Sequence, residues 1–349
     1  ADAEELGFAV ATVLADPGVD SVLVVYTPPF GSGLEASQAA IAKATRDTGK
    51  TVLACVVGHD GLIDERVPSY AFPEQAVAAL ARVAEHAAWR ARPREQVEVK
   101  PRVDRKSARV VVAGDLLRHP EGRWLDHPTA ARLLGHYGVH VAETRTADSP
   151  EAAAEAAAAM GLPAVLKATG PGLVHKSDVG GVVVGLATPQ EVEQAYRDMA
   201  ERIGPAMTGA LVQRMAEAGT EIIIGGVQHE TFGPLVMVGM GGVTAEILRD
   251  QAFRIPPLDL RDAAEMIGEL RGAPLLYGYR GRPKADIEAL AQQIVRVGAL
   301  LDDLPEVAEL DLNPVIATPS GALAVDVRIR VAPAPPRPSS YRRWMRRAR

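Results

Sequence analysis

Short apolar runs alternate with longer amphipathic stretches along roughly the first quarter of the chain. Residues 22–26 and 52–57 are continuously apolar, and residues 34–47 between them have the spacing of a helix. Because continuous apolar runs are typical of strands covered on both faces, this order predicts a βαβ unit with parallel strands. Amphipathic stretches that begin at residue 3 and span residues 73–89 predict a helix on each side of that unit.

The pattern changes after residues 93–107, a segment rich in Arg, Pro, Glu and Lys that we interpret as a linker. Residues 108–117 and 128–136 then favour a pair of helices, although the valines at 110–112 could also form a strand. Short strands mixed with helices follow, which favours an α+β domain over a second parallel sheet. The predicted strands are 139–143, 164–168, 182–186, 210–215, 221–227, 235–238, 307–312 and 322–329, and the predicted helices are 149–160, 189–203, 261–270 and 284–301.

The length of 349 residues exceeds what one hydrophobic core usually organises. We therefore predict an α/β part in residues 1–92, an α+β domain in residues 108–330, and a Pro- and Arg-rich tail in residues 331–349. Half a sheet is a poor independent domain, and the chain begins with Ala rather than Met. We therefore expect more protein upstream of residue 1.

Composition narrows the class of protein further. Hydrophobic residues make up 47% of the chain and the net charge is −6, values that favour a globular protein and exclude nucleic acid or an anionic membrane as main partner. The absence of a long apolar run excludes a membrane span. The single cysteine, Cys55, lies in an apolar run and is expected to be buried, so we expect a cytoplasmic protein without an internal disulfide. The oligomeric state stays open, a homo-oligomer included.

A lysine at the end of an apolar strand, followed by a glycine-rich loop, is the most informative feature. Lys167 needs an anion if its strand is covered, and a nucleotide phosphate would supply one, whereas an ammonium that extends to solvent is the alternative. The loop at residues 168–181 has glycines whose backbone N–H groups can surround phosphate oxygens. It matches neither the P-loop nor the dinucleotide pattern.

Within that loop, His175 stands between glycines rather than on an apolar face. A neutral imidazole is nucleophilic and can carry a phosphoryl group between two sites if its loop swings. A surface histidine with local hydrogen bonds is the alternative. Lys176 and Asp178 beside it favour the functional interpretation.

An acid and an amide near the C-terminal end are candidates for a metal site. Asn313 follows one predicted strand and Asp326 lies in the next, across a turn at residues 319–321. Because Mg²⁺ takes one or two protein oxygens and completes its shell with water and phosphate, this pair suffices chemically. An ion pair between Asp326 and an arginine near Arg328 is the alternative.

Three further features are open to two interpretations. Glu221 could hold a ribose hydroxyl or a cation, or be a solvated carboxylate at a sheet edge. Gly241 and Gly242 could form an anion-binding turn or a plain flexible one. Arg280 and Arg282 are candidate anion contacts, although exposed arginines are usually only solvated.

Taken in order, these motifs resemble the ATP-grasp domain of NDP-forming acyl-CoA synthetases, which are relatives of ADP-forming acetyl-CoA synthetase and succinyl-CoA ligase. The resemblance covers residues 108–330, and residues 1–92 look like the last part of the flavodoxin-like CoA-ligase domain that precedes ATP-grasp in such fusions. The motifs are 165–167, 175–181, 219–221, 232–234, 239–242, 279–281 and 311–314.

The resemblance implies that a carboxylate is activated as an acyl phosphate and that the acyl group passes to CoA. It also implies that a phosphohistidine links this reaction to the interconversion of ATP and ADP. It implies that Lys167 contacts phosphates, that Glu221 and the hinge around Met215 hold the nucleoside, and that His175 receives phosphate. It also implies that Asn313 and Asp326 bind Mg²⁺. The CoA-binding domain would lie upstream, and neither the acyl group nor the choice between ATP and GTP follows from the sequence.

Protein lysine acetyltransferases of the same lineage carry a similar module. An alternative is therefore a catalytically degenerate, ligand-sensing module attached to an acetyltransferase domain. Retention of His175, Asn313 and Asp326 favours a nucleotide-competent site instead, because a degenerate regulator need not keep metal ligands.

Overall fold

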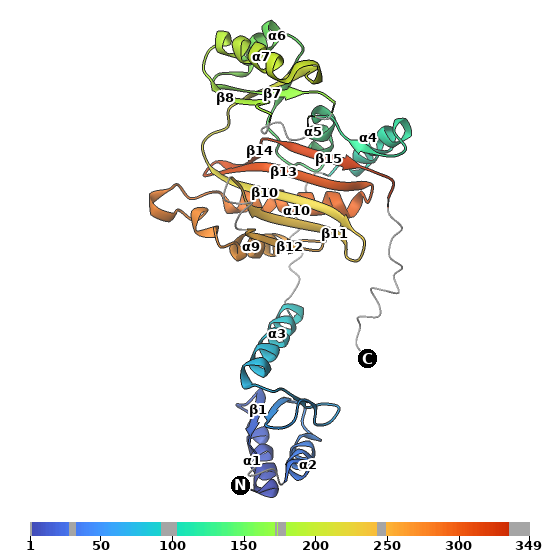
Figure 1. Cartoon of the computed structure of the whole chain (residues 1–349), viewed down its shortest axis with the longest axis vertical. Coiled ribbons are helices and arrows are strands. Elements are labelled where there is room, and N and C mark those ends of the chain that lie inside the picture. The colour runs from blue at the N-terminus through green and yellow to red at the C-terminus, as the bar shows by residue number, and fades with distance from the viewer. Residues whose placement is uncertain are drawn as a thin grey trace. The chain divides into compact units, whose positions relative to one another are not determined.

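The computed structural model describes residues 2–27, 33–91, 103–171, 173, 179–242 and 249–334 (Figure 1). The chain divides into two compact units, Ala1–Arg94 and Glu95–Arg349. Within the described ranges, no helix is both long and apolar enough to cross a membrane.

The first unit is built around the predicted βαβ arrangement. Its elements are α1 (Ala3–Ala15), β1 (Ser21–Tyr26), α2 (Leu34–Thr45), β2 (Thr51–Val56), β3 (Gly61–Leu62), β4 (Pro68–Ser69) and α3 (Pro73–Ala91). β1 pairs with β2 in parallel, which confirms the prediction, and the sheet order is β1-β2-β4-β3. β2 is buried along most of its length and includes Cys55, 3% exposed, whereas Val25 on β1 is 58% exposed. The prediction that both faces of each strand are covered is therefore confirmed for β2. It is wrong for β1, which lies at the edge of the sheet.

The second unit contains two antiparallel sheets with separate cores. The small sheet has the order β6-β9-β7-β8, and Figure 1 shows α6 and α7 together beside it. Its elements are β6 (Thr144–Ala147), α6 (Pro150–Met160), β7 (Ala164–Thr169), β8 (Val182–Leu186), α7 (Pro189–Ile203), η2 (Gly204–Ala206) and β9 (Gly209–Arg214). Alanines of α6 pack against β7 and β9, so small side chains allow the helix to approach the sheet closely.

The large sheet has the order β12-β11-β10-β13-β15-β5, with β14 paired to β13. Its strands are β5 (Arg123–Trp124), β10 (Thr220–His229), β11 (Gly233–Met240), β12 (Gln251–Arg254), β13 (Val307–Thr318), β14 (Gly321–Ala324) and β15 (Val327–Val331). The accompanying helices are α4 (Arg105–Arg118), α5 (His127–Gly135), α9 (Leu260–Glu269), η3 (Ala273–Leu275), η4 (Tyr279–Gly281) and α10 (Ile287–Asp303).

α10 shows why its segment is helical. Asp286 caps its N-terminus by accepting a hydrogen bond from the backbone N–H of Ala289. Apolar side chains at helical spacing, Leu290, Ile294 and Val297, are fully buried against the large sheet. The polar Gln293 is also buried, and its side-chain amide accepts from His140 N–H at 3.1 Å and donates to Ala322 O at 2.9 Å.

Two of the strand predictions were wrong, and a further strand was missed. Residues 139–143 form no strand but only a bridge between Val141 and Ala324, and the strand begins at Thr144 instead. The single strand predicted over residues 322–329 is two strands, because Asn313 N–H bonds Asp326 O and turns the chain between β14 and β15. β12 was not predicted at all. The predicted helical pair after the linker is confirmed by α4 and α5.

Candidate functional site

Lys167 joins the two sheets of the second unit. It lies on β7, is only 6% exposed, and its ammonium donates a hydrogen bond to the carbonyl oxygen of Val325. The alternative of a lysine that extends to solvent is therefore wrong. Because Val325 lies in the turn between β14 and β15, the positive charge is held beside Asp326.

Asn313 and Asp326 lie next to each other at this point. The backbone N–H of Asn313 donates to the carbonyl oxygen of Asp326 at 3.1 Å. The Asp326 side chain is 17% exposed, and its Oδ2 lies 3.9 Å from Arg328 Nε. Arg328 is thus the arginine that the ion-pair interpretation of Asp326 requires. The side chain of Asn313 is exposed. Lys167, Asn313 and Asp326, which are far apart in the sequence, converge in the structure.

A second acid enters this cluster that the sequence reasoning did not assign. Asp311 lies opposite Arg328 in the β13–β15 ladder. Burial raises the pKa of its carboxyl above the ordinary value; Arg328 lowers it, and the negative charges of Asp326 and Glu309 raise it further. The available signal was a carboxylate at an alternating position of an apolar strand, two residues before Asn313.

The donor types at this cluster fit a magnesium ion bound together with phosphates. Asn313 offers an amide oxygen and Asp326 a carboxylate, both of which are hard oxygen ligands. Among the described residues, no group of three or more His, Cys, Asp or Glu side chains is placed to hold a metal. A pair of protein oxygens is what Mg²⁺ requires when phosphate and water supply the remaining ligands.

Glu221, Gly241 and Gly242 form a second group on the neighbouring strands. The backbone N–H of Gly241 donates to Glu221 O at 2.7 Å, and a Cβ at Gly241 would lie 2.8 Å from Glu221 Cβ. Gly242 has φ +80°, and a Cβ there would lie 3.3 Å from Glu221 Oε2. Close approach to Glu221 is therefore a physical reason for both glycines.

These two groups share one face of the large sheet. Glu221 lies opposite Ile316 in the β10–β13 ladder, three residues along the strand from Asn313. Ile222 and Leu312 are fully buried, whereas Glu221 and Asn313 are exposed. The β10–β13 ladder shifts register between Ile222 and Ile224, which changes the alternation of side chains at Asn313. Glu221 and Asn313 therefore both lie on the face away from that core.

Met215 lines a cavity that Ile316, the ladder partner of Glu221, also lines. It lies between β9 and β10, is 42% exposed, and its N–H bonds the carbonyl oxygen of Pro163 at 2.9 Å. It lines a cavity of about 540 Å³ together with Glu217, Thr318 and Leu323, among others. Lys167, Glu221, Asn313 and Asp326 do not line that cavity.

His175 and Lys176 lie outside the described residues, but both ends of their loop are described. Ala168 N–H bonds Gly181 O at 2.8 Å, and Lys167 lies opposite Val182 in the β7–β8 ladder. The loop that contains His175 therefore leaves the small sheet and returns to it beside Lys167.

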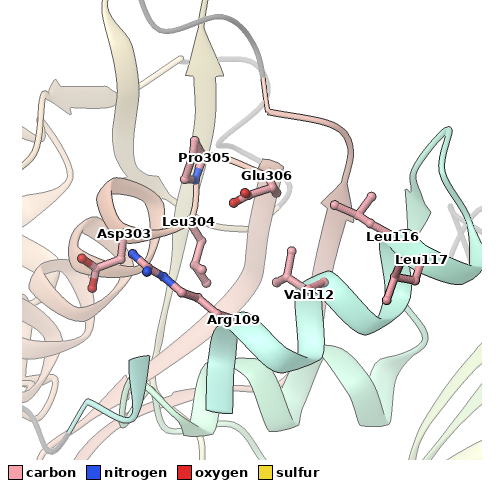
Figure 2. Close-up of a pocket in the computed structure, with 9 residues that line it drawn as sticks. Arg109, Val112, Leu116, Leu117, Asp303, Leu304, Pro305 and Glu306 are labelled. Carbon is pink, nitrogen blue, oxygen red and sulfur yellow. The ribbon is translucent and has the colours of Figure 1, made fainter. Parts of the chain in front are cut away.

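A cavity of about 680 Å³ lies elsewhere, between α4 and the turn that follows α10. Figure 2 shows Arg109 of α4 reaching toward Asp303, with Val112 and Leu116 facing the turn at Leu304. None of the described site residues lines it. Glu306, which lines this cavity, precedes Val307 at the start of β13. Ile316, the ladder partner of Glu221, lies near the other end of β13.

Comparison with known proteins gives a consistent set of relatives. Residues 117–331 match the ATP-grasp domain family. The chain is 39% identical over 214 residues to the beta subunit of acetate–CoA ligase (ADP-forming) I from Pyrococcus furiosus, which covers 60% of this chain and 92% of that subunit. It is 33% identical over 342 residues to acetate–CoA ligase (ADP-forming) I from Archaeoglobus fulgidus, which covers 94% of this chain and 48% of that enzyme. The chain thus spans about half the length of the Archaeoglobus enzyme.

Among solved structures, the dinucleotide-forming acetyl-coenzyme A synthetase 1 of Candidatus Korarchaeum cryptofilum aligns with a TM-score of 0.56 and 40% identity. The alignment covers 64% of this chain and 99% of that chain. That structure contains coenzyme A and Mg-AMPPCP, and its phosphohistidine segment points towards the nucleotide binding site.

Proposed function

Because this chain belongs to the ATP-grasp family of ADP-forming acyl-CoA synthetases, we propose that it binds a nucleotide and transfers phosphoryl between ATP or ADP and His175. In the direction from ATP, the Nε2 or Nδ1 lone pair of His175 attacks the γ-phosphorus. A P–N bond forms, the bond between the γ-phosphorus and the bridging oxygen breaks, and ADP leaves. The reverse step returns the phosphoryl group to ADP.

One observation carries this proposal. Lys167 is buried beside the Asn313–Asp326 pair, and the loop that contains His175 starts and ends at Lys167 and Val182. A cation, two hard oxygen ligands and a nucleophile-bearing loop are the parts that phosphoryl transfer needs, since positioning and charge neutralisation supply most of its catalysis.

The individual residues have separate tasks in this proposal. Lys167 contacts phosphate oxygens, and Lys176, Gly241 and Gly242 add contacts to the nucleotide. Met215 and Glu221 hold the nucleoside from its two sides. Asn313 and Asp326 would hold Mg²⁺, which when bound neutralises phosphate charge.

The acyl chemistry belongs to other parts of the protein. We propose that residues 1–92 are the C-terminal part of a flavodoxin-like CoA-ligase domain and that residues 93–107 link it to the ATP-grasp domain, 108–330. The alignment with the Archaeoglobus enzyme over 94% of this chain supports that order. CoA and the acyl phosphate would bind to domains upstream. None of the relatives reported above has an acetyltransferase name, so the ligand-sensing alternative gains no support.

Labelling with γ-³²P ATP and Mg²⁺ tests the proposal. The wild-type chain should acquire an acid-labile, base-stable label that added ADP removes, as expected for phosphohistidine. His175→Ala should abolish the label, whereas the matched variant His119→Ala, at the exposed C-terminal end of α4, should keep it. An unlabelled wild type, or a label retained in His175→Ala, would contradict the proposal.

A further inference from the structure

Beyond Gly241, the sheet carries an arginine that the sequence analysis did not single out. The paired residues of the β11–β12 ladder end at Gly239 and Gln251, and beyond them Met240 N–H bonds Asp250 O at 3.2 Å. Gly241, the neighbour of Met240, bonds Glu221 O. Arg249, the neighbour of Asp250, therefore lies at the end of the sheet that carries Glu221.

A buried carboxylate places a second arginine beside the first. Asp250 is 9% exposed, and its two oxygens accept the backbone N–H groups of Arg271 at 2.8 Å and Gly272 at 2.7 Å. A Cβ at Gly272 would lie 2.6 Å from Met240 Cγ, so this backbone is packed directly on Met240. Arg249 and Arg271 therefore lie on either side of Asp250, next to Met240 and Gly241.

The backbone of Arg249 is in the left-handed region, with φ +46°. A residue with a Cβ is strained there, and a glycine would adopt the same conformation without that cost. The side chains of Arg249 and Arg271 are exposed, and within the described ranges neither forms an ion pair or a side-chain hydrogen bond. A strained backbone at a residue whose side chain contacts no other part of the protein is typical of a residue that contacts a ligand.

We propose that Arg249, with Arg271 beside it, binds a phosphate group of the ligand held at the Glu221–Gly241 end of the large sheet. A guanidinium presents parallel N–H donors that match two phosphate oxygens. This inference rests on the proposed function, in which the nucleotide supplies the phosphate at this end of the sheet and CoA binds to domains upstream. Asp250 is a positioning residue, because it holds the two arginine backbones together.

Arg249→Gly isolates the guanidinium, because glycine keeps the left-handed backbone and removes the side chain. Isothermal titration of the whole chain with Mg-AMPPCP measures the effect, and titration with CoA is the comparison. We expect the dissociation constant for Mg-AMPPCP to rise at least about tenfold and the response to CoA to stay that of the wild type. Arg249→Lys should recover part of the affinity, because lysine restores the positive charge but not the two parallel N–H donors of a guanidinium.

Arg261→Ala is the matched control. It removes one exposed arginine from α9, whose pair with Glu265 at 3.4 Å is a surface interaction of small energy. Both ligands should bind this variant as they bind the wild type. Wild-type affinities for both ligands in Arg249→Gly, or equal losses in Arg249→Gly and Arg261→Ala, would overturn the inference alone. A wild-type chain that binds neither ligand would overturn the proposed function, and the inference with it.

Discussion

The α4 side of the second unit and the candidate site both hold buried charge, but they satisfy it differently. On the α4 side, Asp115 is 1% exposed and accepts hydrogen bonds from Nε and Nη2 of Arg123. Asp303 accepts hydrogen bonds from the Tyr137 hydroxyl and from Arg105. Each acid there is matched by cations or hydroxyl donors, so its charge is neutralised within the protein.

At the candidate site, two acids share one arginine instead. Asp311 and Asp326 face the same arginine, Arg328, and the charge of Asp326 raises the pKa of Asp311. The buried ammonium of Lys167 bonds a neutral carbonyl oxygen. Two carboxylates that share one arginine repel each other, and pKa shifts of this kind are more frequent at functional sites. Four variants test whether the two regions differ in this way.

Lys167→Met should have the largest effect. We expect the rate of phosphate labelling from ATP to fall about 100-fold to 1,000-fold, because one donor to a transferring phosphoryl group contributes that much. The free energy of unfolding should fall by about 1–3 kcal/mol, because Met fills a similar volume but gives no hydrogen bond to Val325 O. Lys106→Met, at an exposed position in the first turn of α4, is the control and should label normally. Normal labelling by Lys167→Met would mean that this lysine is structural.

Arg123→Met should lower the stability of the fold and leave nucleotide binding unchanged. Removing the guanidinium leaves the Asp115 carboxylate buried without its partner, so the free energy of unfolding should fall by about 3 kcal/mol. Urea unfolding measures it, and the folded protein should bind Mg-AMPPCP as the wild type does. Arg330→Met, which breaks an exposed pair with Glu309 at 3.7 Å, should cost less than about 1 kcal/mol. Equal losses in the two variants would mean that the buried Asp115–Arg123 pair stabilises the fold no more than the exposed Arg330–Glu309 pair does.

Asp326→Asn separates ligand binding from stability within the candidate site. Loss of the carboxylate should weaken binding of Mg-AMPPCP about tenfold, because the amide is a poorer ligand for Mg²⁺. Repulsion of Asp311 is relieved at the same time, so the free energy of unfolding should change by less than about 1 kcal/mol. Titration calorimetry at several Mg²⁺ concentrations measures the first quantity. A Mg²⁺ dependence identical to that of the wild type would exclude Asp326 as a metal ligand.

Tyr137→Phe should have the smallest effect at neutral pH, about 1 kcal/mol for one lost hydrogen bond to Asp303. Burial, with the charge of Asp303, raises the pKa of Tyr137 above its ordinary value of 10.0. The folded state thus favours the neutral phenol, and this stabilisation is complete below pH 10 and is lost as the pH rises above it. Unfolding measured between pH 7 and 11 should show a shallower decline in the variant. Parallel curves would contradict this assignment.

The helices could be predicted from the sequence because their signals are local. Ser149 followed by Pro150 marks the start of α6, and Asp286 caps α10. The strands at 139–143 and 322–329 were predicted wrongly because a strand exists only where a partner pairs with it. Asp326 is in a turn since its carbonyl oxygen bonds Asn313, a contact that the apolar pattern of the strand does not encode.

For the candidate site, the sequence indicated Lys167, Asn313 and Asp326 because each is a polar residue in or beside an apolar strand. It did not indicate Asp311 or Arg249. Asp311 has the same signal but no chemistry assigned to it, and the left-handed backbone of Arg249 has no signature in a residue that is not glycine.

The sequence by itself determined the family, the helices and the types of side chain available for phosphate chemistry, because these depend on residue identity and on spacing over a few turns. Only the tertiary structure decided which of those side chains meet. Lys167 and Val325 are 158 positions apart, and their contact depends on how two separately packed sheets are joined. Such contacts follow from packing and strand register over the whole unit, which no local pattern records.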